Sequence, residues 1–438
     1  MIRSRLIAAS TLAGLLTLTT PVSSQPAATP PPAAEDEKAV QLFKAGKLDD
    51  ALKELQKLAK ANPQLPPARI RMSELLVKAG QGQAARSQLE LAAAEDPRHP
   101  AVFLMNGSYA FGEGRITDTV LSCQAALAAA ADPRWDADQR KKFTREARLG
   151  LAAAFEARRD WQAAKENLTA ILNDDPKQMV ARQRMAAANF WLGGPEQAFS
   201  EFQAIYKDDP TQELPEMRMA QLWGAREPEK SETWLKRAVT THPKVAKSHR
   251  AYAGWLLDNA RGEEAQVYVD SASKLDPNSR ETLALRGLLA RYKKDYSTAE
   301  QAFEALHKDY PNDAFAAWNL ALTLIESDDA NKKRRAVDLA EAEVRKNQRG
   351  AEGYAVLGWC YYKSGRLEEA DKALGTAGTA GQVRLDTAYF MARLLADKMK
   401  YEEAHKILKE AVNGRGPFPY RTDAQALLTE VEAKLPKK

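Results

Sequence analysis

The amino-acid sequence predicts an all-α fold: a solenoid of about eleven helical hairpins closed by a C-terminal capping helix. Two ladders of residues carry this prediction. Prolines recur at steps of 34, 36, 43, 34, 33, 34 and 34 residues, at Pro63, Pro97, Pro133, Pro176, Pro210, Pro243, Pro277 and Pro311. Small residues follow the same period, at Ala51, Ala85, Thr119, Ala164, Ala198, Ser231, Ala265, Ala299, Ala336, Ala370 and Ala404. A fixed period of this length is typical of a repeat array, so the 438-residue chain is expected to stack repeated units and not to build one large core.

The residues before the first repeat are expected to form two segments. Residues 1–24 have the composition of a secretory signal peptide, with Arg3 and Arg5 at the start, an apolar stretch to Thr19 and small residues before an expected cleavage after Ser24. Residues 25–37, rich in proline and alanine, predict an extended disordered linker. A membrane-spanning helix needs about 20 apolar residues, more than the apolar stretch offers. The sequence therefore predicts an exported chain, periplasmic or secreted, that is soluble after cleavage and has no transmembrane span.

Residues 38–416 are expected to form the hairpins, each of two amphipathic helices. In residues 354–361 large side chains recur three and four positions apart, which places them on one helix face, and Gly358 lets another helix approach closely. Gly365 ends this first helix. In the second helix, small Ala370 is expected where the two helices cross, and large Leu374 fills the space one turn later.

This pattern resembles the tetratricopeptide repeat family, in which a large residue, Leu-Gly, Tyr, Gly, Ala, a large residue, Ala and Pro follow in order. Good matches are Met72, Leu76, Gly80, Ala85, Leu89, Ala92 and Pro97 in the second unit, Met185, Ala186, Gly193, Ala198, Phe202, Ile205 and Pro210 in the fifth, Gly287, Ala299, Phe303, Leu306 and Pro311 in the eighth, and Ala392, Leu395, Ala404, Leu408 and Ala411 in the eleventh. The chain thus resembles an exported, bacterial-type member of the family. The resemblance implies a right-handed superhelical solenoid over residues 38–416, with residues 417–438 as a capping helix and tail.

Four places depart from the pattern. Residues 131–142, with Trp135, are about ten residues longer than the pattern requires and are expected to protrude as a longer helix or loop. Ser231 replaces the crossing alanine of the sixth unit, and residues 327–333 lengthen the turn of the ninth. The glycines at 375, 378 and 381 are expected to shorten or fray the second helix of the tenth unit, since each costs about 1 kcal/mol in a helix interior.

The resemblance implies that the first helix of each hairpin lines a concave groove and that partner proteins or peptides bind along it. Aromatic and arginine side chains dominate the binding energy of many interfaces. Twelve such residues are expected to face the groove: Arg184, Phe190, Trp191, Trp223, Arg250, Arg291, Tyr292, Trp318, Trp359, Tyr362, Tyr389 and Arg393. The alternative that several of them pack between adjacent hairpins stays open.

The predicted function is a non-enzymatic protein-interaction scaffold outside the cytoplasm. The alternative is a scaffold subunit of an envelope machine for polysaccharide export or outer-membrane assembly, which would bring glycan contact into the groove. The sequence offers no catalytic, metal or cofactor constellation, because its histidines (His99, His242, His249, His307 and His405) are scattered over different repeats. Paired glutamates such as Glu368-Glu369 recur where a second helix starts, a position that the helix dipole favours.

Charge and thiol content exclude further classes. Without Arg3 and Arg5 the formal net charge is 62 − 59 = +3, which gives no electrostatic case for nucleic acid. The basic run at residues 332–335 is interpreted as a solvated helix start. Cys123 and Cys360 are too few for a disulfide framework. The repeat register places both at helix positions that face the inside of the fold.

Overall fold

A computed structural model describes residues 37–62, 65–224, 226–346, 350–380 and 383–435. Within these residues the regular secondary structure consists of α-helices and includes no β-strand, so the predicted all-α repeat solenoid is confirmed. The predicted signal peptide at 1–24 and all but the last residue of the predicted linker at 25–37 lie outside the described residues. None of the described helices is long and apolar enough to cross a membrane.

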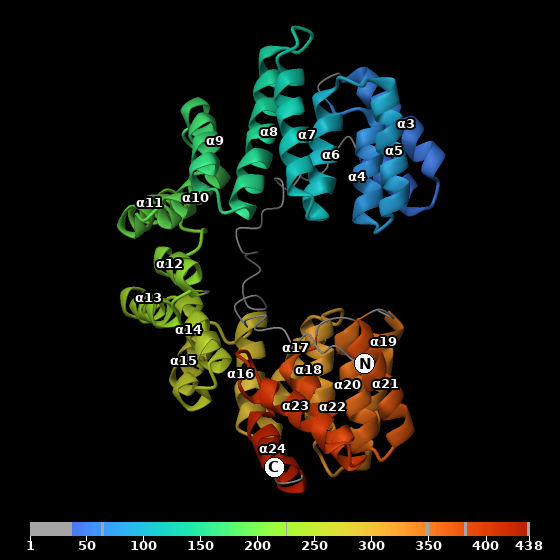
Figure 1. Cartoon of the computed structure of the whole chain (residues 1–438), viewed down its shortest axis with the longest axis vertical. Helices are drawn as coiled ribbons and strands as arrows, with labels where there is room; N and C mark the ends of the chain where they lie inside the picture. Colours follow the sequence, from blue (N-terminus) through green and yellow to red (C-terminus); the bar gives the residue numbers. More distant parts are fainter. Residues whose placement is uncertain (1–36, 63–64, 225, 347–349, 381–382, 436–438) are drawn as a thin grey trace. The chain divides into compact units, whose positions relative to one another are not determined.

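The described residues fall into two compact units, with the boundary in the chain between Pro215 and Glu216. The N-terminal unit holds α2 (Glu37–Lys44), α3 (Leu48–Ala61), α4 (Ala68–Lys78), α5 (Gly82–Glu95), α6 (Pro100–Gly112), α7 (Ile116–Ala130), α8 (Ala137–Ala157), α9 (Trp161–Asp174), α10 (Met179–Trp191) and α11 (Pro195–Asp208). The C-terminal unit holds α12 (Pro215–Gly224), which begins at the boundary, α13 (Pro228–Thr241), α14 (Ala246–Asp258), α15 (Gly262–Leu275), α16 (Arg280–Tyr292), α17 (Tyr296–Asp309), α18 (Ala314–Leu324), α19 (Ala330–Lys346), α20 (Ala351–Lys363), α21 (Leu367–Ala380), α22 (Leu385–Asp397), α23 (Tyr401–Val412) and α24 (Arg421–Lys434). In both units successive helices pack side by side as hairpins (Figure 1).

The even-numbered helices from α2 to α22 are the first helices of their hairpins, and short turns lead from them into the odd-numbered second helices. Most of these turns place one residue in the left-handed region, where glycine carries no steric penalty. The residue is a glycine at Gly46, Gly80, Gly114, Gly193 and Gly365, and another residue type with a φ near 60° at Arg159, Ala260, Lys294 and Met399. The steps between these positions are often 34 residues, so the period seen in the sequence is also present in the backbone conformation.

The contact between the two helices of a hairpin follows the predicted pattern of small and large residues. A Cβ atom added at Gly358 on α20 would lie 2.7 Å from Cγ of Leu374 on α21. At the equivalent place in an earlier hairpin, a Cβ atom at Gly287 would lie 2.5 Å from the ring of Phe303. The crossing residue Ala370 is fully buried. Glycine and alanine are therefore required by the close approach of the helices.

The expected shortening or fraying of the second helix in the tenth hairpin is wrong. Helix α21 runs through Gly375 and Gly378 to Ala380, whereas position 381 lies outside the described residues. Leu374 and Ala377 of this helix are buried, and a Cβ atom at Gly378 would lie 3.0 Å from Cε of Met391 on α22. Burial of the apolar face against neighbouring helices outweighs the low helix propensity of glycine.

The departure at residues 131–142 behaves as predicted, whereas the turn of the ninth unit is lengthened only over residues 325–329, because α19 already begins at Ala330. The extra residues near position 137 lengthen α8 to 21 residues, and Trp135 before it packs edge-on against His99 and Phe143. Ser231 takes the crossing position on α13 and is 3% exposed. The chain closes with α24, which buries Ala424, Leu427 and Val431 against the preceding hairpin.

Candidate protein-binding surface

All twelve candidate residues lie on first helices. Arg184, Phe190 and Trp191 are on α10, Trp223 on α12, Arg250 on α14, Arg291 and Tyr292 on α16, Trp318 on α18, Trp359 and Tyr362 on α20, and Tyr389 and Arg393 on α22. The first three belong to the N-terminal unit and the others to the C-terminal unit. We call the surface that α14, α16, α18, α20 and α22 form the first-helix face of the C-terminal unit, since each of these helices packs against the next.

The candidates on α10 join this helix to the hairpin before it. The guanidinium of Arg184, which is 4% exposed, donates to the Glu156 carboxylate at 2.9 Å and to the Leu149 carbonyl at 3.1 Å. Burial raises the pKa of Glu156, and the charge of Arg184 opposes this shift. Phe190 is buried, while Trp191 is half-buried and stacks on Trp161 with ring centroids 5.5 Å apart. Of these three, Trp191 keeps a partly exposed ring.

Four candidates in the C-terminal unit remain half-buried, and three of them have defined contacts. Arg250 donates to Asp276 at 2.8 Å, across the turn into the next hairpin. The hydroxyl of Tyr292 donates to the Ala260 carbonyl at 3.1 Å. The Trp223 ring lies 4.1 Å from Nζ of Lys230. Trp318 differs from these because its buried indole Nε1 has no hydrogen-bond partner among the described residues. Arg250 and Tyr292 therefore join neighbouring hairpins, and all four side chains still expose part of their surface.

The remaining five candidates meet on the first-helix face of the C-terminal unit. Trp359 is 3% exposed and stacks on Tyr362 with a centroid separation of 5.0 Å. It also contacts the ring of Tyr389 at 5.5 Å. Arg393 donates to the Tyr362 hydroxyl at 3.2 Å. Arg291, which lies on α16, reaches the same cluster through Tyr420, as described next.

Sequence reasoning missed the residue at the centre of this cluster, Tyr420. It comes from the connection between α23 and α24, is 6% exposed, and stacks on Tyr389 at 5.4 Å. Its hydroxyl donates to Oε1 of Glu326 at 3.0 Å, and the guanidinium of Arg291 lies 5.3 Å from its ring centroid. We define the Tyr420 pocket as the five residues around this side chain, Arg291, Glu326, Trp359, Tyr389 and Phe390. The only sequence signal for it is the apolar run at residues 417–420, just before the capping helix.

The floor of the Tyr420 pocket is charged. Arg291 donates to Asn319 at 2.6 Å and lies 3.9 Å from the carboxylate of Asp386. Burial raises the pKa of the Asp386 carboxyl, and the charge of Arg291 opposes this shift. Burial also raises the pKa of Tyr420 well above its usual value, and the nearby charge of Glu326 adds to the shift. The Tyr420 hydroxyl is therefore protonated and acts as a hydrogen-bond donor.

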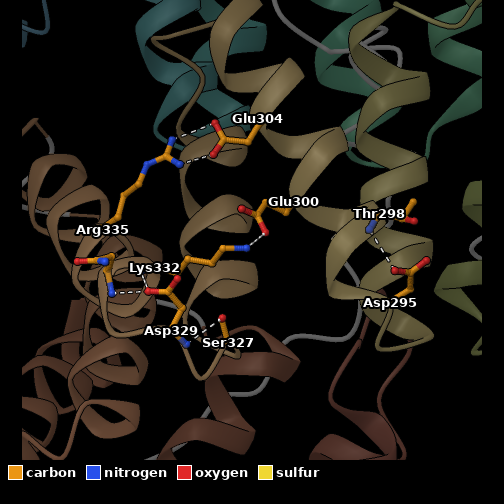
Figure 2. A network of polar contacts seen from close by, with 9 residues as sticks. Asp295, Thr298, Glu300, Glu304, Ser327, Asp329, Lys332 and Arg335 are labelled. Atoms are coloured by element: carbon orange, nitrogen blue, oxygen red, sulfur yellow. Dashed lines mark hydrogen bonds and ion pairs between the residues drawn. The ribbon is translucent and has the colours of Figure 1, made fainter.

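The basic run at residues 332–335 is engaged in contacts within the C-terminal unit. Lys332 donates to Glu300 at 2.6 Å, and Arg335 makes a two-pronged ion pair with Glu304 (Figure 2). Asp329 accepts from the backbone N–H of Asn331 at 2.7 Å, which caps the start of α19. The charges of Lys332 and Arg335 therefore join α17 to α19.

The histidines and thiols lie apart from one another in the part of the chain that the structure describes. No cluster of metal-ligating side chains is found there. Cys123 and Cys360 are free thiols, and both are buried as predicted. Burial raises the pKa of Cys123 to about 11, which keeps this thiol protonated and unreactive.

Matches to known protein families agree with this architecture. Residues 42–105, 283–313 and 328–377 match families described as tetratricopeptide repeat. No curated protein sequence matches the chain. Among solved structures, the chain is similar to yeast Tom70 at 13% identity, over 92% of this chain and 95% of that one, with a TM-score of 0.36. It is similar to a chain of the APC/C hetero-tetramer Cut9–Hcn1 at 13% identity, over 90% and 88%, with a TM-score of 0.41. A third similarity is to a tetratricopeptide repeat protein from Parabacteroides merdae at 14% identity, over 66% and 99%, with a TM-score of 0.38.

Proposed function

Since this chain is a tetratricopeptide repeat protein, we propose that it is an exported, non-enzymatic scaffold that holds an extended segment of a partner protein on the first-helix face of its C-terminal unit. Repeat proteins of this kind serve protein interaction. Beyond protein interaction, we propose the binding face, the extended form of the partner segment and the location outside the cytoplasm.

One observation carries the choice of face. The first-helix face of the C-terminal unit already holds an extended stretch of polypeptide, the connection between α23 and α24. The backbone N–H of Gly416 donates to the Asp258 carbonyl on α14 at 2.9 Å, and Tyr420 fills a pocket to which α16, α20 and α22 contribute. A face that accepts one proline-containing segment has the backbone acceptors and aromatic contacts that a partner segment needs.

Partly exposed candidate residues extend this face. Trp318 and Tyr362 are half-buried on adjacent first helices, α18 and α20. Large aromatic rings contribute much contact area for little loss of conformational entropy, which makes both positions suited to a partner.

Site-specific photo-crosslinking tests the proposal. A photoreactive residue is placed at Trp318 or Tyr362, and in a control at Val267, which is 59% exposed on the second helix α15 of the same unit. Crosslinking in cells of the native source is expected to give one protein adduct from both first-helix positions and none from position 267. Equal capture from all three positions would contradict the proposed face. An adduct that contains glycan and no protein would contradict the protein-holding role.

The proposed location has its own test. Residues 1–24 have the composition of a signal peptide, which supports export. N-terminal sequencing of the native protein is expected to begin at Gln25. A native chain that still begins at Met1 in the cytoplasmic fraction would refute export.

A further inference from the structure

The connection between α23 and α24 is longer than comparable connections in the same unit. It spans residues 413–420, whereas residues 276–279 join α15 to α16 and residues 310–313 join α17 to α18. Pro417 and Pro419 restrict its backbone to extended conformations. The additional residues form no helix and cover the first-helix face.

The side chains of this connection are buried as deeply as core residues. Phe418 is 2% and Tyr420 is 6% exposed. A Cβ atom at Gly414 would lie 2.5 Å from Cδ2 of Leu385, so the backbone lies directly against α22. Beyond the pocket, Lys294 in the turn between α16 and α17 pairs with Asp423 at 2.7 Å, which fixes the start of α24.

The surface beneath the connection is more polar than a purely structural contact requires. Arg291 and Asp386 are both buried, and Nη2 of Arg291 and Oδ1 of Asp386 make no hydrogen bond among the described residues. Glu326 lies at the same place and accepts from both Tyr420 and the indole of Trp359. Buried ions cost several kcal/mol of desolvation, so a permanent cap would be more stable over an apolar floor. These charges act directly on the occupant, because Glu326 accepts from the Tyr420 hydroxyl and the Arg291 guanidinium lies 5.3 Å from its ring centroid, so the floor favours a segment that carries a tyrosine.

We propose that the Tyr420 pocket is a tyrosine-recognition site for the partner, and that residues 416–421 occupy it in the absence of the partner. This inference rests on the proposed function. The partner segment has the chemistry of the built-in occupant: an extended, proline-restricted stretch with an unmodified tyrosine. Its hydroxyl donates to Glu326, and its ring lies between the guanidinium of Arg291 and the aromatic rings of Trp359 and Tyr389. Because the built-in segment is tethered, it competes at a high effective concentration and sets a threshold for partner binding.

A peptide with the sequence of residues 414–423, GRGPFPYRTD, is the probe, and fluorescence anisotropy of a labelled copy measures its binding. Tyr420→Ala empties the pocket of the full-length chain and is expected to bind the peptide at least about tenfold more tightly than the wild-type chain. Tyr310→Ala, which removes a tyrosine that is 40% exposed, is the matched control and is expected to bind like wild type.

A double-mutant cycle tests the tyrosine contact itself. On the Tyr420→Ala chain, a peptide with phenylalanine in place of its tyrosine is expected to bind about tenfold more weakly, because a hydrogen bond to a carboxylate is lost. Adding Glu326→Gln is expected to weaken the tyrosine peptide by a similar factor and to leave the phenylalanine peptide nearly unchanged. Equal effects of Glu326→Gln on both peptides would overturn the assigned contact.

Hydrogen exchange on the wild-type chain decides the question without a variant. Saturating peptide is expected to speed exchange at the amides of Gly416 and Arg421, because the built-in segment leaves the face. If the Tyr420→Ala chain folds, the inference is wrong when the peptide neither binds that chain nor changes hydrogen exchange in the wild-type chain. If the Tyr420→Ala chain does not fold, unchanged hydrogen exchange in the wild-type chain is enough to refute the inference. It is also wrong if excess peptide leaves the crosslinked adduct at Trp318 and Tyr362 undiminished, whereas absence of any adduct would count against the proposed function instead.

Discussion

The substitution Gly358→Ala, which adds one methyl group, tests how closely the two helices of a hairpin approach each other. The added Cβ atom of Gly358→Ala would lie 2.7 Å from Cγ, 3.0 Å from Cδ2 and 3.1 Å from the backbone nitrogen of Leu374. Carbon atoms pack best at about 3.5–4.0 Å. The side chain of Leu374 is 2% exposed and has little room to move, and its backbone nitrogen moves only with α21. The substitution therefore forces α20 and α21 apart.

The expected magnitude combines two opposing effects. Overpacking of a core costs about 1–3 kcal/mol. Replacing glycine by alanine inside a helix returns about 1 kcal/mol. The free energy of unfolding of Gly358→Ala is thus expected to fall by up to about 2 kcal/mol. Gly375→Ala on α21 is the matched control, because a Cβ atom there meets nothing within 4 Å, and its stability is expected to rise by about 0.5–1 kcal/mol.

Denaturant unfolding followed by far-UV circular dichroism gives both values on the full chain. Both variants gain the same helix preference, so the difference between them isolates the steric cost, expected to be about 1–3 kcal/mol. In a Leu374→Ala background, the cost of Gly358→Ala is expected to shrink by about 1 kcal/mol, since the two crowding side-chain atoms, Cγ and Cδ2, are gone. Equal stability changes at Gly358 and Gly375 would refute the close approach as the reason for glycine.

Three further predictions concern stability. Met399 has a φ of 60° and is 74% exposed, so Met399→Gly is expected to raise the free energy of unfolding by about 1 kcal/mol in the same denaturant assay, and a loss would contradict the strain. Arg184→Ala leaves the buried Glu156 without its ion pair and is expected to cost about 3–5 kcal/mol, part of which an added Glu156→Gln should recover. Burial lowers the pKa of His99 to about 4, with Arg134 acting in the same direction and Asp96 against it. Its folded pKa lies below the usual 6.5, so its contribution of up to about 3 kcal/mol is present above pH 6.5 and is lost as the pH falls towards 4. His99→Asn, which keeps a helix-capping side chain, is expected to flatten this part of the pH profile; an unchanged slope would assign it to other groups.

The candidate surface was only partly predictable from the sequence. The helical register placed all twelve candidates on first helices, because a residue's face follows from its position in a regular helix. Register does not tell whether a side chain on that face meets solvent or a neighbouring element. Phe190 and Trp359 lie on first helices and are nevertheless only 5% and 3% exposed. Whether the partly exposed candidates bind a partner stays a prediction.

The glycines of α21 show a second limit. Low helix propensity predicted a frayed helix, and the observed helix is intact to Ala380. Local preference amounts to about 1 kcal/mol per glycine, whereas burying one leucine side chain contributes about 1.5–3 kcal/mol. Leu374 of α21 packs against Gly358 on α20, and Met391 on α22 packs beside Gly378 of α21. These contacts between helices could not be seen from the local sequence of α21.

By itself, the sequence determined the repeated hairpin: the 34-residue period, the glycine at the turn and at the close approach, the alanine at the crossing and the capping helix. These features depend on contacts between neighbouring repeats, which are neighbours in sequence as well. Only the tertiary structure placed Tyr420 against Glu326, 94 residues away, and the Gly416 amide against Asp258. Such contacts depend on the small rotation between successive repeats, summed over several of them, and no local pattern of residues encodes that sum.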